Sequence, residues 1–124
     1  MEPREFLAVR QKLQKTQKEV SQVLGTSLRG VQSFEQGWRK IPAHVERQVL
    51  FLLAMKNRIS RKVSPCWVIR RCALPLRKNC PAWQFRVGDL CWFINGTLCQ
   101  GKVQRWSKKM KVCRKCPVME AHMK

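Results

Sequence analysis

Apolar residues recur at helical spacing over the first 56 positions of the chain and lose that regularity afterwards. At the start of the chain, Phe6, Val9 and Leu13 are three or four positions apart, which places them on one face of an α-helix. Comparable spacing continues to residue 56, and the pattern predicts four helices, over about residues 3–13, 17–24, 27–36 and 43–56.

Capping residues and glycines mark the ends of the predicted helices. Thr16-x-x-Glu19 is a capping box, in which the threonine oxygen accepts from the Glu19 amide and the glutamate reaches back. Gly25 supplies the backbone freedom that ends the second helix, and Ser27 or Thr26 caps the third. Two short helices joined by so tight a connection are typical of a helix-turn-helix.

The third helix is oriented by the rotation of about 100° per residue once Val31 and Phe34 are placed inward. Gly30 then falls beside the apolar stripe, where we expect it to let the second and third helices approach closely. Leu28 lies at the edge of the stripe. The outward positions are Arg29, Gln32, Ser33 and Gln36.

These outward side chains suit contact with DNA. Arg29 and Gln32 carry the hydrogen-bonding forks that read guanine and adenine edges in the major groove. Gln17, in the first turn of the second helix, can donate to a phosphate and brace the third helix. Arg39 and Lys40 stand where the chain would pass a phosphate strand, as positioning contacts.

Glu35 is the acidic residue of the third helix. The phosphates of DNA would repel it, so we expect an internal ion pair, with Arg10 or Arg39 as the partner.

The first domain resembles a known family at a set of spaced motifs. Residues 5–56 resemble the lambda-repressor-like (Cro/repressor, XRE-type) helix-turn-helix domain, through Thr16-Gln17, Leu24-Gly25, Ser27, Val31, Phe34-Glu35-x-Gly37 and Arg39 to Pro42. The resemblance implies a compact bundle of about five helices, sequence-specific binding of double-stranded DNA, and a homodimer on a two-fold symmetric operator. By position, it implies base contacts from Ser27, Leu28, Arg29 and Ser33, and phosphate contacts from Gln17 and the loop of Trp38, Arg39 and Lys40. Leu28 is apolar where the family commonly has a polar reader, and Gly30 is unusual in a recognition helix.

The fourth predicted helix has more apolar surface than one face requires. One stripe is formed by Val45, Val49, Leu52 and Leu53, and it is widened by Leu50, Phe51 and Met55. Two interpretations stay open: a core helix with spare exposure, or a face that docks a second subunit or the cysteine-rich half.

The cysteines and the charge divide the chain in two. All seven cysteines lie between Cys66 and Cys116. Residues 1–60 hold 11 lysines and arginines against 5 acids, and residues 61–124 hold 15 against 2, giving a net charge of +19. We predict a helix-turn-helix domain of four to five helices over 1–57, a linker over 58–64, a small irregular cysteine-rich domain of short strands and loops over 65–119, and a tail over 120–124.

The charge favours a polyanionic partner such as nucleic acid. The longest apolar run, Val49 to Met55, has seven residues, whereas a membrane span needs about twenty. With no secretory signal at the N-terminus, we expect a cytoplasmic protein without a membrane partner. Thiols stay reduced there, which favours metal or redox chemistry over structural disulfides.

The spacing of the cysteines is mostly wide. Cys113-x-x-Cys116 has the tight loop that lets two thiolates hold one ion, and the basic background favours thiolates. The segment from Cys91 to Cys99 is expected to form a hairpin over Asn95-Gly96, and without a bulge those two cysteines would lie on opposite faces.

The cysteine-rich half also resembles the two-CW domain, a small bacterial module often attached to signalling proteins. The likeness covers residues 65–119 through Cys66-Trp67, Cys72, Cys80-Pro81-Ala82, Cys91-Trp92, Gly96-Thr97-Leu98-Cys99, Gly101 to Gln104 and Cys113-x-x-Cys116. It implies a zinc or iron–sulfur site with a structural or sensing role, for which the candidate ligands are Cys66, Cys72, Cys80, Cys91, Cys99, Cys113 and Cys116. The alternative is a set of buried reduced thiols in an aromatic core of Trp67, Trp83, Trp92 and Trp106. His44 and His122 are expected to be surface or tail residues.

Two functional hypotheses follow. The first is a DNA-binding transcriptional regulator whose cysteine half carries a metal or cluster. The second is a single-stranded nucleic-acid binder of low specificity that uses tryptophan stacking and basic charge, with a structural metal site. We do not expect an enzyme or a small-molecule substrate, because the sequence places no histidine base near a cysteine and has no nucleophile motif.

Overall fold

The computed structural model describes residues 1–124 except 59–63, 70, 72, 100, 101 and 124. The chain forms two compact units, Met1–Lys56 and Asn57–Lys124, which we call the first and second units. The described residues are mainly helical, with a single pair of short strands among them. In the described part of the chain, no helix is long and apolar enough to cross a membrane.

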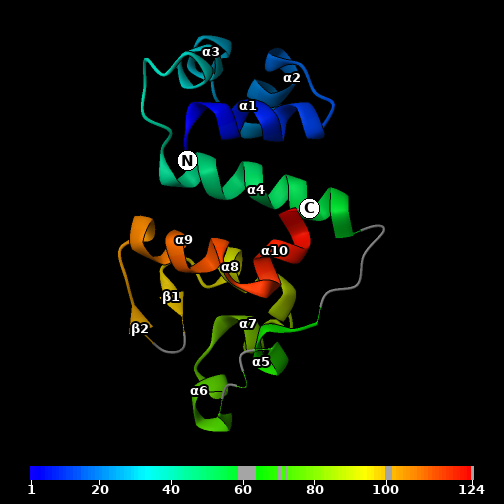
Figure 1. The fold of residues 1–124 in the computed structure, drawn as a ribbon, viewed down its shortest axis with the longest axis vertical. Helices are drawn as coiled ribbons and strands as arrows, with labels where there is room; N and C mark the ends of the chain where they lie inside the picture. The colour runs from blue at the N-terminus through cyan, green and yellow to red at the C-terminus, as the bar shows by residue number, and fades with distance from the viewer. Residues whose placement is uncertain (59–63, 70, 72, 100–101, 124) are drawn as a thin grey trace. The chain divides into compact units, whose positions relative to one another are not determined.

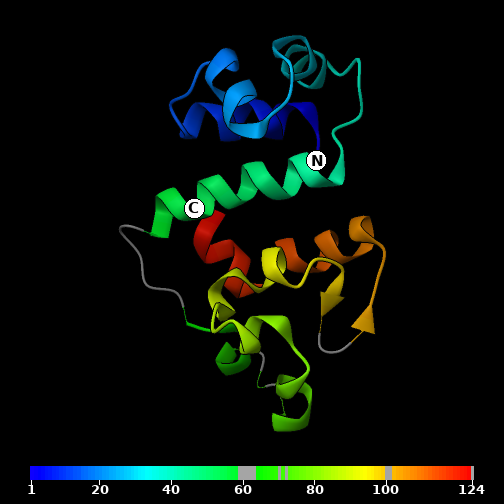
Figure 2. The same ribbon diagram turned by 180° about the vertical axis from the view of Figure 1, so that it is seen from behind.

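The first unit is built from four helices (Figure 1). They are α1 (Pro3–Lys12), α2 (Gln17–Leu24), α3 (Leu28–Gln36) and α4 (Ala43–Arg58), and the last two residues of α4 belong to the second unit. The two views agree that α2 and α3 lie on one side of α1 and that α4 passes on the other side (Figure 2). All four helices predicted from the apolar pattern are present. The predicted linker begins inside α4, because Arg58 is still helical.

The core of the first unit contains the apolar side chains that the helical pattern predicted. Phe6 of α1 packs against Phe34 of α3 with ring centroids 5.8 Å apart in an edge-to-face arrangement. Val20 and Val31 are also fully buried. Val23 of α2, although apolar and one helical turn from the buried Val20, is exposed. The other buried apolar residues of this unit are Val9, Ile41, Val45, Val49, Leu50, Leu53 and Ala54.

The capping box at the start of α2 is confirmed. The Glu19 amide donates to Thr16 Oγ1 over 3.1 Å, and the Thr16 amide donates to Glu19 Oε1 over 3.0 Å. These hydrogen bonds lower the pKa of Glu19 below its ordinary value. Gly25 and Gly37, which end α2 and α3, have φ of +70° and +79°, in the left-handed region that favours glycine. The local signals therefore fix both ends of the two helices.

The second unit consists of short elements. They are α5 (Cys66–Ile69), α6 (Leu74–Lys78), α7 (Pro81–Gln84), the 3₁₀ turn η1 (Gly88–Leu90), α8 (Cys91–Ile94), β1 (Leu98–Cys99), β2 (Lys102–Val103), α9 (Trp106–Arg114) and α10 (Pro117–Met123). The antiparallel strands pair Leu98 with Val103 and Cys99 with Lys102. This hairpin lies beside α9 at one edge of the unit (Figure 2).

Three predictions for the second unit are wrong. Most of its described elements are short helices, where short strands and loops were predicted. The hairpin over Asn95-Gly96 is absent, because Cys91 begins a helical turn that ends at Asn95. The Asn95 side chain is engaged instead with the backbone of α7, where its Oδ1 accepts from the Ala82 amide over 2.9 Å. The predicted tail from residue 120 is the end of α10, and His122 is fully buried there.

Candidate nucleic-acid interface and cysteine cluster

One face of α3 presents polar side chains to solvent. Arg29 and Gln32 are exposed, as their positions in the helix predicted, whereas Val31 and Phe34 on the other face are buried. Leu28 at the first turn is also partly exposed. Ser27 caps the helix by accepting from the Gly30 amide over 2.9 Å. Residues 28, 29 and 32 therefore form an accessible surface that begins at the capped end of α3.

Ser33 does not belong to that surface. Its side chain is 8 % exposed, and its hydroxyl donates to the Arg29 carbonyl over 2.9 Å. This bond to the carbonyl four residues earlier is common for serine inside a helix. The prediction that Ser33 faces outward is therefore wrong, because its small side chain fits against the buried side of α3.

Gly30 makes room for the connection before α3 and not for α2. A Cβ atom at this position would lie 3.0 Å from Thr26 Oγ1, 3.2 Å from Ser27 Oγ and 3.7 Å from Arg39 Nη1. We expected Gly30 to let α2 and α3 approach each other closely. The atoms nearest to an added Cβ belong instead to Thr26 and Ser27, in the turn that caps α3. The glycine, which costs a helix about 1 kcal/mol relative to alanine, leaves the cap undisturbed.

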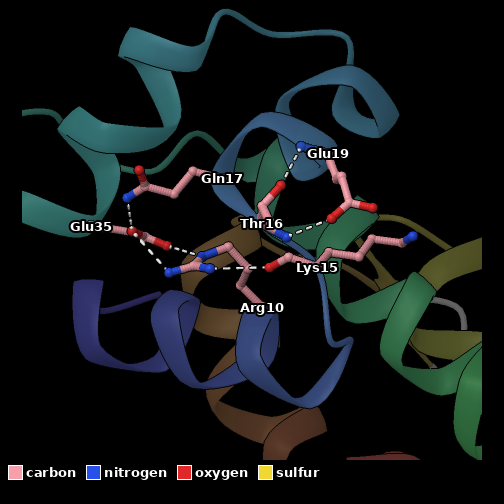
Figure 3. A network of polar contacts seen from close by, with 6 residues as sticks. All are labelled: Arg10, Lys15, Thr16, Gln17, Glu19 and Glu35. Carbon is pink, nitrogen blue, oxygen red and sulfur yellow. Dashed lines mark hydrogen bonds and ion pairs between the residues drawn. The ribbon is translucent and has the colours of Figure 1, made fainter.

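A network of polar side chains holds α1, α2 and α3 together (Figure 3). The Arg10 guanidinium of α1 pairs with the Glu35 carboxylate of α3 and also donates to the Lys15 carbonyl over 3.0 Å. The Gln17 side-chain amide, at the start of α2, donates to the same carboxylate. Of the two partners expected for Glu35, Arg10 is confirmed. Gln17 braces α3, as expected, by giving its amide hydrogen to Glu35.

The loop after α3 is exposed and basic. Trp38 is 77 % exposed, and Arg39 and Lys40 are also exposed. The Arg39 guanidinium lies over the Phe34 ring, 5.5 Å from its centroid, so the charged end of the side chain is held beside α3. The amides of Trp38 and Arg39 both donate to the Ser33 carbonyl, at 2.9 and 3.3 Å. The end of α3 therefore fixes the backbone of this loop.

The second unit gathers several thiols. Cys66, Cys80, Cys91, Cys113 and Cys116 are reduced. Cys72 lies outside the described residues, and Cys99 is in β1 with its side chain likewise outside them. A small core cluster is formed by Cys66, Ala82 and Val118, with Cys80, Cys91 and Cys116 among the side chains packed against it.

Four of these thiols influence one another. Cys91 shares a side-chain hydrogen bond with Cys66, and the thiols of Cys113 and Cys116 are near enough to act on it electrostatically. The hydrogen bond with Cys66, followed by burial and these neighbours, raises the pKa of the Cys91 thiol above its ordinary value. The basic background was expected to favour thiolates, but at Cys91 the local surroundings favour the neutral thiol.

Among the described residues, no group of three or more Cys, His, Asp or Glu side chains could hold a metal ion. Thiols are the donor type that zinc and iron–sulfur clusters take in proteins, so the donor chemistry fits either group.

Gly88 allows the segment before Cys91 to lie close to the segment around Cys66. A Cβ atom there would lie 2.5 Å from Trp67 Cζ3 and 2.7 Å from Pro65 Cβ. Any side chain at this position would collide with the tryptophan ring that follows Cys66. Sequence reasoning missed Gly88, because a glycine within a polar turn carries no sign of a partner more than twenty residues away.

The remaining thiol of the cluster, Cys80, has a different environment. The Asn95 side-chain amide donates to its sulfur over 3.3 Å. The same Asn95 holds the Ala82 amide, so it ties α7 to the end of α8. Cys80 is thus part of a hydrogen-bonded contact between two helical turns.

No protein-family model, curated protein or solved structure matches the chain.

The aromatic side chains of the second unit are mostly committed to packing. Trp92 is almost fully buried, and Trp67 packs edge-on against Trp83 with centroids 4.9 Å apart. The guanidinium groups of Arg77 and Arg86 lie over the Trp83 ring, 5.3 and 4.0 Å from its centroid. A nucleobase could stack on Trp83 only by displacing them, which disfavours the stacking hypothesis.

A charge network around the buried His122 side chain in α10 was not foreseen. His122 Nε2 lies 3.4 Å from Asp89 Oδ2, and Arg58 Nε lies 3.1 Å from the same oxygen. Burial lowers the pKa of His122 below its ordinary value, against the opposing effect of Asp89. The sequence offered only a histidine near the end of the chain, with nothing to pair it with Asp89.

Proposed function

We propose that this protein is a transcriptional regulator that binds double-stranded DNA in a sequence-specific way through α3. The observation that carries the proposal is the braced α2–α3 pair, which presents Arg29 and Gln32 outward next to an exposed basic loop. The pair has the features of a helix-turn-helix of the lambda-repressor-like type, with α3 as its recognition helix.

The base contacts are assigned to the first half of α3. Arg29 and Gln32 are one helical turn apart, so the Arg29 guanidinium and the Gln32 side-chain amide lie on the same face of α3 and can enter the same groove. Each is the kind of side chain that pairs with a purine edge, and one such pair discriminates by about 1–3 kcal/mol. Leu28 is exposed and can contact a thymine methyl group in the major groove, so an apolar side chain at this position can also take part in base recognition. Ser27 keeps its hydroxyl proton for a further hydrogen bond, because its oxygen is the acceptor in the cap.

The phosphate contacts are assigned to the loop of Trp38, Arg39 and Lys40. The backbone of this loop is fixed by the Ser33 carbonyl, so the two cations are held beside the end of α3. Gln17 acts by holding Glu35 and hence the orientation of α3. The Arg10–Glu35 pair keeps the acidic charge of α3 neutralised inside the domain and away from DNA.

The regulator is proposed to act as a homodimer on a two-fold symmetric site, which is the usual arrangement for this motif. The second unit is proposed to hold zinc or an iron–sulfur cluster through its cysteines, for structure or for sensing. Residues 61–124 hold 15 basic residues against 2 acids, and this positive charge adds attraction for DNA of any sequence.

The test is selection of binding sites from a random double-stranded library with the full-length protein, followed by titration of the selected site. Arg29→Ala and Gln32→Ala are each expected to weaken binding of the selected site by about 5- to 150-fold, corresponding to 1–3 kcal/mol, and to relax the preference at one base pair. Matched controls are Arg4→Ala and Gln11→Ala, which remove the same side chains from exposed positions of α1. The controls are expected to change affinity less than twofold.

Equal affinity for unrelated duplexes would overturn the sequence-specific function. Tighter binding of single strands than of duplexes, lost on substitution of Trp83 or Trp106, would support the single-stranded binder instead. Equal losses in the α3 variants and the α1 controls would show that charge alone drives the interaction and would remove α3 as the reading element.

A further inference from the structure

Two guanidinium groups of the second unit share one aromatic ring, those of Arg77 and Arg86 over Trp83. We infer that this pair is a contact site for the phosphodiester backbone of nucleic acid, separate from α3 and indifferent to base sequence. The inference rests on the proposed function for the identity of the polyanion, double-stranded DNA, and adds a second binding surface to it.

The turn after α7 places Arg86 over the ring. The Arg86 amide donates to the Trp83 carbonyl over 3.1 Å. The next amide, that of Val87, donates to the Ala82 carbonyl over 2.9 Å, which completes the Schellman pattern of a helix end. Arg86 has φ of +55°, in the left-handed region where this pattern usually has glycine. The turn therefore carries a side chain that its backbone does not require, and the guanidinium of that side chain lies 4.0 Å from the centre of the Trp83 ring.

The ring beneath the two guanidinium groups is held by packing. Trp83 lies edge-on against Trp67 with ring centroids 4.9 Å apart. Trp67 in turn covers Gly88, where a Cβ atom would lie 2.5 Å from its Cζ3. The second guanidinium comes from Arg77 in the last turn of α6, which packs beside α7 (Figure 1). Both charges therefore lie within 5.3 Å of one ring centre whose position is fixed by its neighbours.

A guanidinium stacked on a ring keeps its hydrogen-bond donors available. Its flat face meets the ring, and its N–H groups lie in its own plane, around the edge. The Arg86 guanidinium, at 4.0 Å from the ring centre, is at the separation of stacked groups. A phosphate group can accept two such N–H groups side by side. Stacking also restricts the side chain before it binds, so less conformational entropy is lost when a phosphate is bound.

The segment that carries the pair contains no acid. Residues 64–88 hold five lysines and arginines and no Asp or Glu. The next acid along the chain, Asp89, is paired with Arg58 and lies 3.4 Å from His122 Nε2. Two neighbouring cations repel each other, and a phosphate bound to both removes that repulsion. The segment is therefore suited to an anion that carries many negative charges.

Nucleic acid is the polyanion that best fits this surface. Basic and apolar residues that bind a membrane surface are usually arranged on one amphipathic helix, often of about 20–30 residues. Helices α5, α6 and α7 have only four or five residues each, and the exposed apolar side chains Val68, Leu74 and Phe85 come from three separate turns. Because the guanidinium groups already cover the Trp83 ring, the site contacts the backbone and not the bases, and it carries no sequence information.

The test is fluorescence anisotropy of the full-length protein with a labelled duplex of unrelated sequence, at salt concentrations between about 50 and 200 mM. Arg77→Gln and Arg86→Gln are each expected to weaken binding by about 3- to 10-fold. Each should also lower the slope of log affinity against log salt concentration by about 1, the effect of losing one phosphate contact. The matched control is Arg105→Gln, which removes an exposed arginine before α9 in the same unit. The control is expected to change affinity less than about twofold and to leave the slope unchanged.

Two further variants separate phosphate binding from a role in folding. Arg86→Gly removes the guanidinium but supplies the residue that the left-handed turn favours. We expect it to lose as much affinity as Arg86→Gln while its urea unfolding midpoint is unchanged or higher. Trp83→Leu keeps both arginines and is expected to weaken binding by about threefold without any change of charge, because the guanidinium groups are no longer held.

Unchanged salt slopes in Arg77→Gln and Arg86→Gln, or losses equal to that of Arg105→Gln, would overturn the site. A loss of stability in Arg86→Gly that matches its loss of affinity would assign the pair to folding and overturn the site as well. Vesicles of phosphatidylcholine and phosphatidylglycerol in equal parts test the other anionic surface. Tighter binding to these vesicles than to the duplex, lost in the two glutamine variants, would overturn nucleic acid as the polyanion.

The same titrations in an Arg29→Ala/Gln32→Ala background separate this site from the function on which it rests. We expect the slope changes of Arg77→Gln and Arg86→Gln to persist there, because they remove contacts on a different surface. A wild-type protein without preference among duplexes, but with these slope changes, would refute the sequence-specific function and leave the site standing. A clear preference with unchanged slopes would remove the site alone, and failure of the wild-type protein to bind any duplex would overturn both.

Discussion

The Arg10 guanidinium and the Glu35 carboxylate form an ion pair that joins α1 to α3, and the Gln17 amide of α2 completes it. Both charged side chains are largely buried, with 17 % and 6 % of their surface exposed. Removing one partner leaves the other charged and poorly solvated, which typically costs about 3–5 kcal/mol for a buried pair. This pair therefore links the stability of the first unit to the orientation of its exposed face.

Glu35→Ala is expected to lower the free energy of unfolding of the first unit by about 3 kcal/mol, because Arg10 and Gln17 both lose their acceptor. Urea unfolding followed by circular dichroism measures the change. Glu2→Ala removes an exposed carboxylate of the same unit as a control and is expected to change stability by less than about 0.5 kcal/mol. Similar values for the two variants would contradict a bracing role for Glu35.

Gly30→Ala is expected to destabilise the protein, although alanine is the better helix former by about 1 kcal/mol. The added methyl group would press on Thr26 Oγ1 and on the Ser27 oxygen that caps α3. In a Thr26→Ala background, the same substitution is expected to cost about 0.5–1 kcal/mol less in free energy of unfolding, since one of the crowded atoms is absent. Thermal unfolding of the wild-type protein, the two single variants and the double variant gives the coupling energy between positions 26 and 30. A gain in stability on Gly30→Ala alone would refute the proposed crowding.

Lys40→Ala is expected to weaken DNA binding to a similar extent for all duplex sequences. It should also reduce the slope of log affinity against log salt concentration by about 1, which is the effect of losing one phosphate contact. Lys12→Ala, an exposed lysine of α1, serves as the control and should leave the slope unchanged. Fluorescence anisotropy at several salt concentrations measures both quantities. A sequence-dependent loss would assign Lys40 to base reading instead.

The buried His122 is expected to make the second unit less stable in mild acid. Its folded-state pKa is lowered by burial, so the unfolded chain binds the proton more readily than the folded chain. Its contribution to stability is fully present above the unfolded pKa of about 6.5 and is lost as the pH falls through the folded value.

The pH effect is isolated by comparing the wild-type protein with His122→Leu at each pH between about 5 and 8 by urea unfolding. The wild-type curve should fall more steeply toward low pH than that of the variant, which has no group to protonate at this position. Parallel curves would show that His122 is not the group responsible. Asp89 and Arg58 remain in both proteins, so their ion pair does not affect the comparison.

The first unit could be predicted because its signals are local. The capping box at Thr16, the cap at Ser27 and the glycines at 25 and 37 act within a few residues, and each defines a helix end by itself. The inference that Glu35 pairs internally followed from charge alone. Ser33 was misplaced because a serine satisfies its hydroxyl within its own helix and is small enough for the buried side.

The second unit could be predicted only in outline because its order depends on contacts between distant residues. Asn95-Gly96 has the local signature of a hairpin, yet the asparagine side chain is engaged by Ala82 and Cys80. Gly88 has a role only in relation to Trp67. The sequence suggested that the cysteines act together, whereas the packing of Cys80, Cys91 and Cys116 against Cys66 depends on residues far apart in the chain.

The one-turn helices of the second unit have a consequence for its dynamics. α5, α7 and α8 have four residues each, which is far too short for a helix to persist in water by itself. Their backbone hydrogen bonds therefore exist only while the side chains around them remain assembled. We expect their amide hydrogens to exchange with solvent at one common rate, as a single cooperative block, and occupancy of the thiol cluster should slow that rate for all three turns together.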